Sequence, residues 1–134
     1  MSYWLIKTEP SAWSWQDQQQ KLTTAWDGVR NYQASNNLKA MNVGDLCLFY
    51  HSVTDKKIMG IVQVTKPYYP DLSDETGRFG MVDVIYKESF VNPVSLETIK
   101  KHPQLQHLAL VKQSRLSVMP IDPEAWDIIL GLSQ

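Results

Sequence analysis

Short apolar or alternating stretches bounded by turns predict the strands of this chain. Residues 3–8 alternate over a β-branched and aromatic stretch and stop at Glu9-Pro10, which is typical of a strand end. Residues 46–52 are apolar on both faces, as expected of a strand covered by a helix, and a turn at residues 55–57 leads into a strand over residues 58–66. Further strands are expected over residues 81–90, 108–111 and 116–119.

Capping residues predict about four short helices. Stretches of helical pattern follow the cap-forming residues Ser14, Asn31, Ser95 and Asp122. The first helix is expected to run to about residue 22, and the second shows apolar residues at helical spacing over residues 34–41. The third is expected to end at residue 101, and the fourth, with Pro123 at its first position, at Gly131.

The order of these elements indicates the fold class. Five or six short strands and about four helices follow one another without a regular βαβα alternation. There is no internal repeat, linker or low-complexity segment. We therefore expect a single domain over residues 1–134 with an α+β fold, in which a mixed sheet is closed or nearly closed into a barrel with the helices packed around it.

Composition narrows the class of protein. A length of 134 residues and a hydrophobic fraction of 43% suit one globular domain. No apolar run approaches the roughly 20 residues that span a bilayer, so no membrane partner is expected. The N-terminus lacks a signal-peptide pattern, and the single cysteine, Cys47, suits a reducing compartment. These features favour the cytoplasm.

Charge and aromatic content limit the kinds of ligand. The net charge of −1 argues against broad, charge-driven binding to long nucleic acid, which normally needs a basic surface. A nucleic-acid contact should therefore be local, with a few cations around one nucleotide. Five Trp, six Tyr and three Phe exceed what a core of this size requires, although most of them are expected in the core.

Several kinds of catalytic or metal site are not expected. Cys47 and His51 share a strand face, but four residues at about 3.3 Å each place them roughly 13 Å apart, too far to hold one ion. His102 and His107 flank a proline without a supporting cluster, so neither a metal nor a cofactor is expected. There is no Gly-x-Ser-x-Gly motif and no glycine-rich phosphate loop, and Cys47 is expected to be a buried, inert thiol.

The segment at residues 25–34, AWDGVRNYQA, carries the side chains that a flat ligand needs. Trp26 and Tyr32 offer faces for stacking, and Gly28 permits close backbone approach. Asn31 offers edge hydrogen bonds, and Arg30 or the start of the following helix offers a partner for an anion. The alternative is a purely structural loop anchored by the tryptophan and followed by an asparagine cap.

Six motifs, in order along nearly the whole chain, resemble the EVE domain family, closest to the thymocyte nuclear protein group and its short bacterial relatives. They are YWLIKTEP at residues 3–10, WDGVRNYQA at 26–34, FYHS at 49–52, YPD at 69–71, MVDV at 81–84 and RLSVMP at 115–120. The resemblance implies a PUA-like barrel, related to YTH domains, that binds modified bases, with modified cytosine in DNA favoured. The chain departs from the family pattern at Ser35, where an Arg is common, and at Phe79, where a Trp is usual.

Carried over onto this sequence, the resemblance implies a nucleobase pocket. Its lining would consist of Lys7, Thr8, Trp26, Gly28, Val29, Arg30, Asn31, Tyr32, Tyr50, His51, Ser52 and Arg115. Some of these residues have structural alternatives: Lys7 as a rim cation, His51 as a structural histidine and Arg115 as half of a salt bridge. The remaining tryptophans, Trp4, Trp13, Trp15 and Trp126, are expected in the core or against helices.

Three functions remain open. The first is a reader module that binds a flipped, modified base in DNA or RNA without transforming it. The second is an amidohydrolase acting on acylated cytidine, as in the related ASCH group, with Lys7, Thr8 and Glu9 in the site. Against it, adjacent strand residues point to opposite faces, so Lys7 and Thr8 share a cavity only if the strand has ended. The third is a structural adaptor without a small ligand.

Overall fold

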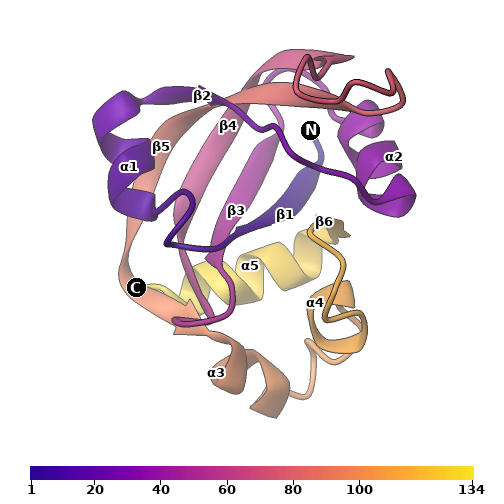
Figure 1. Cartoon of the computed structure of the whole chain (residues 1–134). Helices are drawn as coiled ribbons and strands as arrows, with labels where there is room; N and C mark the ends of the chain where they lie inside the picture. Colours follow the sequence, from indigo (N-terminus) through magenta and orange to yellow (C-terminus); the bar gives the residue numbers. More distant parts are fainter.

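A computed structural model describes all residues, 1–134, and a six-stranded sheet lies at its centre (Figure 1). The strands are β1 (Tyr3–Thr8), β2 (Thr23–Ala25), β3 (Leu46–His51), β4 (Lys57–Pro70), β5 (Gly80–Ser95) and β6 (Val118–Ile121). Their order across the sheet is β2-β5-β4-β3-β1-β6. β1 and β3 run parallel, and the other four neighbouring pairs are antiparallel.

The sheet is strongly curved but open. β4 and β5 are its longest strands, and their pairing changes register at several points between Ile58 and Tyr69. Such irregularities bend strands and increase their twist. The curvature is plain in Figure 1, yet the edge strands β2 and β6 do not pair with each other. The α+β class and the mixed sheet are thus confirmed, whereas the predicted barrel is only partly closed.

Five helices surround the sheet, and the four predicted caps are confirmed. The helices are α1 (Trp15–Lys21), α2 (Tyr32–Ala40), α3 (Leu96–Lys101), α4 (Ala109–Lys112) and α5 (Pro123–Leu132). Ser14, Asn31, Ser95 and Asp122 each accept a backbone N–H three residues ahead through their side chains. α5 continues to Leu132, so Gly131 lies within the helix and does not end it. None of the five helices has the length and apolar character of a membrane-spanning helix.

Two short segments differ from the prediction. Residues 108–111 were expected as a strand, but Ala109–Lys112 form the short helix α4, in which Leu110 is buried. A run of four apolar residues fits either element, because it is too short to show a period. The three-residue strand β2 was not expected, since Thr23–Ala25 carries no alternating pattern; its pairing with β5 defines it.

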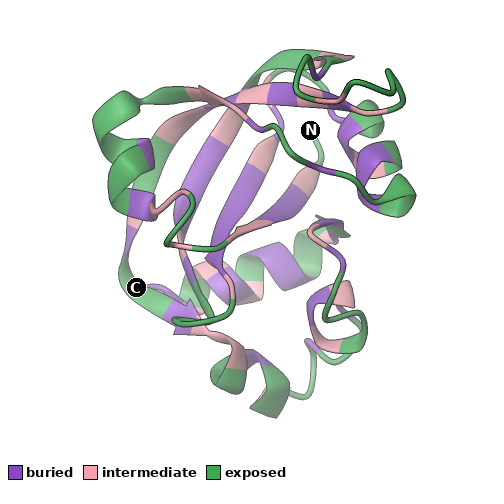
Figure 2. Ribbon diagram, viewed as in Figure 1, coloured by how far each residue is buried: buried purple, intermediate pink, exposed green.

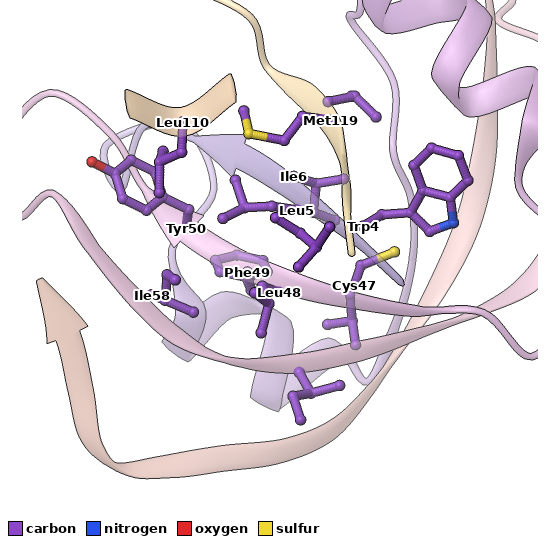
Figure 3. Close-up of a cluster of buried hydrophobic side chains, with 14 of the residues drawn as sticks. Trp4, Leu5, Ile6, Cys47, Leu48, Phe49, Tyr50, Ile58, Leu110 and Met119 are labelled. Carbon is purple, nitrogen blue, oxygen red and sulfur yellow. The ribbon is translucent and has the colours of Figure 1, made fainter. Parts of the chain in front are cut away.

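Buried side chains on the inner face of the sheet form one core. Figure 2 shows the buried stretches of the central strands, and Figure 3 shows Leu5, Ile6, Leu48 and Phe49 from β1 and β3 within this cluster. Trp4, Trp15 and Trp126 belong to the core, as predicted. Gly60 on β4 allows Trp15 to approach, since a Cβ there would lie 2.3 Å from the indole ring. α1 is thereby seated directly against the sheet.

Candidate functional site

A cavity of about 830 Å³, hereafter the main cavity, lies where β1 ends, beside the segment that follows β2. Seven of the predicted site residues line it: Lys7, Thr8, Trp26, Gly28, Val29, Arg30 and Asn31. Seven others join them: Ala12, Trp13, Lys21, Thr24, Ala25, Asp27 and Ser117. The volume is within the range of small-molecule sites, roughly 300–1,000 Å³.

Trp26 contributes to the core and to the main cavity at once. Its side chain is buried, and its indole meets the ring of Phe49 edge-on, with the ring centroids 5.5 Å apart. Its backbone N–H donates to the carbonyl of Val82 at 2.7 Å, which continues the pairing of β2 with β5. The indole is therefore held in one position before any ligand arrives.

Trp13 is a second aromatic wall of the main cavity, and we had expected it only in a packing role. It is half-buried, and its Nε1–H donates to Oε1 of the buried Gln18 at 2.9 Å. The hydroxyl of Thr8 donates to the Trp13 carbonyl at 3.1 Å, so the end of β1 fixes the segment that carries this indole. In the sequence, the only sign that Trp13 could line a cavity is its place just before the Ser14 cap, outside the helix.

Lys7 and Thr8 both line the main cavity. The sequence allowed this only where the strand ends, and they are the last two residues of β1. The Lys7 Nζ donates to the carbonyl of Ser114 at 3.0 Å and lies 5.7 Å from the centre of the Tyr50 ring. Burial lowers the pKa of the Lys7 ammonium.

A buried carboxylate, Asp71, holds the segment 26–31 in place. It accepts hydrogen bonds from the backbone N–H of Gly28 at 2.9 Å and from Nη1 of Arg30 at 3.0 Å. The backbone N–H and hydroxyl of Ser73 also donate to it, at 2.9 and 2.6 Å. Burial opposes ionisation of Asp71, but these hydrogen bonds outweigh it and hold its pKa well below the usual range. The segment between β4 and β5 thus begins with a clamp on the cavity wall.

The partner of Arg30 in the structure is therefore Asp71. The guanidinium also donates from Nη2 to the Ser73 hydroxyl at 3.0 Å and lies 5.8 Å from the centre of the Phe79 ring. Phe79, where the family usually has Trp, keeps an aromatic ring against this cation. Ser35, the other departure, is buried in α2, and its hydroxyl lies 3.4 Å from that of Tyr68.

Asn31 has a free donor group at the edge of the main cavity. Its Oδ1 accepts the backbone N–H of Ala34 at 2.9 Å and so caps α2. This bond sets the orientation of the amide, and no hydrogen bond in the structure uses its nitrogen. Asp27, beside it in the same motif, also lines the cavity, and its carboxylate has no ion-pair or hydrogen-bond partner.

His51 and Tyr50 lie outside the main cavity. His51 is buried; its Nε2 accepts the backbone N–H of Trp15 at 2.9 Å, and its Nδ1 lies 3.0 Å from Oδ2 of Asp55. This pattern assigns the proton to Nδ1, which then donates to the carboxylate. Nε2 thus fastens the start of α1 to the end of β3, and Nδ1 joins β3 to the turn that follows it. Tyr50 is buried as well, and burial raises the pKa of its hydroxyl to about 12.

Three further predicted residues also lie away from the main cavity. Tyr32 is 60% exposed, with its ring centroid 5.1 Å from that of Phe79. Ser52 is half-buried and donates its backbone N–H to the carbonyl of Thr8 at 2.9 Å. Arg115 is exposed in a neighbouring, smaller cleft.

Residues 2–132 match the family model of the EVE domain. This chain is a member of the EVE domain family. Thymocyte nuclear protein 1 of Rattus norvegicus is 34% identical over 167 aligned positions, which cover 99% of this EVE domain and 74% of the rat protein. A solved structure of a Rhodopseudomonas palustris protein is 41% identical, with a TM-score of 0.94 and coverage of 99% of this chain and 93% of that one.

Two other solved structures are similar to this EVE domain to different degrees. The human THYN1 protein was solved in complex with 5-methylcytosine-containing DNA; it is 31% identical to this EVE domain, with a TM-score of 0.89 and coverage of 100% and 98%. An ASCH protein from Zymomonas mobilis is 10% identical with a TM-score of 0.63, a likeness of fold alone.

The sulfur and imidazole groups of this EVE domain form no common site. No group of three or more His, Cys, Asp and Glu side chains is placed to hold a metal ion. Cys47 is fully buried in β3, as predicted, and burial raises the pKa of its thiol.

Proposed function

We propose that this EVE domain is a nucleic-acid reader module that holds one flipped, modified base of DNA or RNA in the main cavity. The observation that carries this proposal is the cavity itself, with Trp13 and Trp26 in its lining and the free edge groups of Asp27 and Asn31 beside them. The complex of the similar human THYN1 protein with 5-methylcytosine-containing DNA supports it.

The two indoles supply enough energy for such a ligand. Taking a base out of a stack costs a few kcal/mol. Stacking a base on an aromatic side chain contributes about 1–3 kcal/mol. Trp26 is held in place by Phe49 and Val82, and Trp13 by Thr8 and Gln18, so little ordering is needed when the base enters.

The free polar groups favour cytosine. Cytosine presents an amino donor beside ring acceptors, whereas thymine and uracil present a carbonyl acceptor in place of the amino group. The Asp27 carboxylate can accept from the amino group, and the Asn31 amide can donate to a ring acceptor. A carbonyl facing Asp27 would leave both groups unsatisfied, which costs about 1–3 kcal/mol. A methyl group on the base, held in an apolar pocket, would favour the methylated base over the unmethylated one by about 1–3 kcal/mol.

The contacts of Lys7 and Thr8 favour binding over catalysis. The Thr8 hydroxyl donates to a backbone carbonyl, and the Lys7 ammonium donates to another, so neither is paired with a base that would activate it. Glu9 is exposed and does not line the main cavity. The amidohydrolase alternative therefore has two of its three residue types at the cavity, but no activated nucleophile.

The first experiment tests the aromatic wall. Wild-type protein is titrated with 5-methylcytidine, and binding is followed by tryptophan fluorescence and calorimetry. Trp13→Ala should raise the Kd about 5- to 150-fold, the equivalent of 1–3 kcal/mol of stacking. The matched control is Tyr32→Ala, which removes an exposed aromatic ring outside the cavity and should leave the nucleoside Kd within about twofold. Saturable binding that Trp13→Ala leaves unchanged would refute the assignment, and no binding by wild type would refute the function.

The second experiment tests base selection and flipping. Asp27→Asn should reduce the preference for cytidine over uridine, because an amide can present either a donor or an acceptor. Flipping is measured with 2-aminopurine placed next to a 5-methylcytosine in duplex DNA, whose fluorescence rises when its neighbour leaves the stack. A cytidine preference that persists in Asp27→Asn removes Asp27 from base selection. Tight duplex binding without a fluorescence change contradicts flipping.

A further inference from the structure

A second cleft of about 330 Å³ adjoins the main cavity. Asn31, the cap of α2, lines both, so the two lie next to each other at the start of this helix. The second cleft is also lined by Lys112, the last residue of α4, and by Arg115 in the segment that links α4 to β6. Lys7 joins this segment to the main cavity, because its Nζ donates to the carbonyl of Ser114.

The charged side chains that line the second cleft are all cationic. Its lining contains Lys112 and Arg115 but no carboxylate. Neither side chain takes part in any of the four ion pairs of the chain, and both are exposed. Arg30, which the sequence offered as the anion partner, is instead held by Asp71. The amides of Gln33 and Gln113 complete a polar lining.

Positive charge gathers around the two cavities although the chain as a whole is slightly acidic. Four cations without a carboxylate partner line the two cavities, Lys7, Lys21, Lys112 and Arg115, against one carboxylate, Asp27. They amount to +3 on a chain of net charge −1, so the rest of the molecule carries −4. A cleft of one sign on an otherwise acidic molecule focuses its field on an anion there.

We infer that the second cleft binds a phosphate of the nucleotide whose base occupies the main cavity, an inference that rests on the proposed function. In a nucleotide the phosphate lies one sugar away from the base, which matches two cavities that meet at one residue. The Arg115 guanidinium suits a phosphate, since its planar N–H groups can donate to two oxygens at once, and Lys112 adds a point charge. Nucleic-acid binding thus needs no broad basic surface.

The test separates base binding from phosphate binding. Wild type, Arg115→Gln and Lys112→Gln are titrated with 5-methylcytidine, its 5′- and 3′-monophosphates, and a single-stranded oligonucleotide containing one 5-methylcytosine. Wild type should bind at least one monophosphate more tightly than the nucleoside. Each variant should lose that gain while its nucleoside Kd changes less than twofold. The slope of log K against log salt for the oligonucleotide should become shallower by roughly 0.7 for each cation removed.

The matched control is Lys100→Gln, which removes an exposed lysine from α3, away from both cavities. It should leave every affinity and the salt slope unchanged. An Arg115→Gln Lys112→Gln double variant that keeps the wild-type oligonucleotide affinity and salt slope would overturn the inference and leave the base proposal standing. Equal losses for nucleoside and monophosphate would also overturn it, by moving these cations to the base. Failure of wild type to bind any nucleoside refutes the proposed function instead.

Discussion

Asn31 combines a structural role with a proposed binding role, and two substitutions separate them. Its Oδ1 caps α2, while its amide nitrogen is free beside the main cavity. Asn31→Ala removes both roles. Loss of the cap should lower the free energy of unfolding by about 1 kcal/mol and the Tm by about 4 °C. Loss of one hydrogen bond to the base should raise the Kd by about 2- to 13-fold, the equivalent of 0.5–1.5 kcal/mol.

Asn31→Asp removes only the binding role. Aspartate caps helices as well as asparagine does, and its charge at the start of α2 is favourable by about 0.3–1 kcal/mol, so the Tm should stay level or rise. The carboxylate, however, presents an acceptor where the base needs a donor, which should raise the Kd by about 5- to 150-fold. Thermal melting and nucleoside titration of both variants give the result. Wild-type affinity in Asn31→Asp would refute the assignment of the amide as a donor to the base.

Three other outcomes follow from the same geometry. Trp26→Ala should lower the free energy of unfolding by about 3–5 kcal/mol in urea titrations, because the indole is buried against Phe49; a loss below about 1 kcal/mol would show that it is not part of the core. Asp71→Asn should destabilise the fold by about 1–3 kcal/mol at pH 7. Because the pKa of Asp71 is held low in the fold, this difference should stay constant above about pH 5 and shrink as the pH falls below about 4; a difference that grows in acid would contradict the clamp. Incubation with acylated and alkylated cytidines should give no product by chromatography, and product formation that disappears in Lys7→Ala or Thr8→Ala would favour the amidohydrolase instead.

Local signals in the sequence predicted the parts of the fold that depend on neighbouring residues. The caps at Ser14 and Asn31 involve residues three positions apart, so their chemistry is visible in a short window. The ends of β4 and β5 were harder to predict from the sequence, because irregular pairing carries these strands beyond residues 66 and 90. Closure of the sheet depends on whether β2 meets β6, which no local pattern reports.

The candidate site shows the same limit. The run WDGVRNYQA marked the segment 26–31, and that segment does line the main cavity. The clamp from Asp71 to Gly28 joins positions 43 apart, and the charge of Asp71 in a polar loop gave no sign of its burial. Ser117 lies directly before β6 and accepts the backbone N–H of Lys7, so it reaches the cavity through the pairing of β1 with the β6 region. Trp13 was overlooked because a tryptophan beside a helix usually packs against it.

The place of β1 between β3 and β6 has a consequence for synthesis of the protein. β1 pairs with β3 on one side and with β6 on the other, so Tyr3 lies opposite Ile121. The ribosome makes β1 first and β6 last among the strands, and in between, one edge of an apolar strand has no partner within the nascent chain. Unpaired strand edges favour aggregation, so β1 carries this hazard until β6 has been made. The main cavity needs both Lys7 and Ser117, so a chain that stops before Ser117 has no complete site.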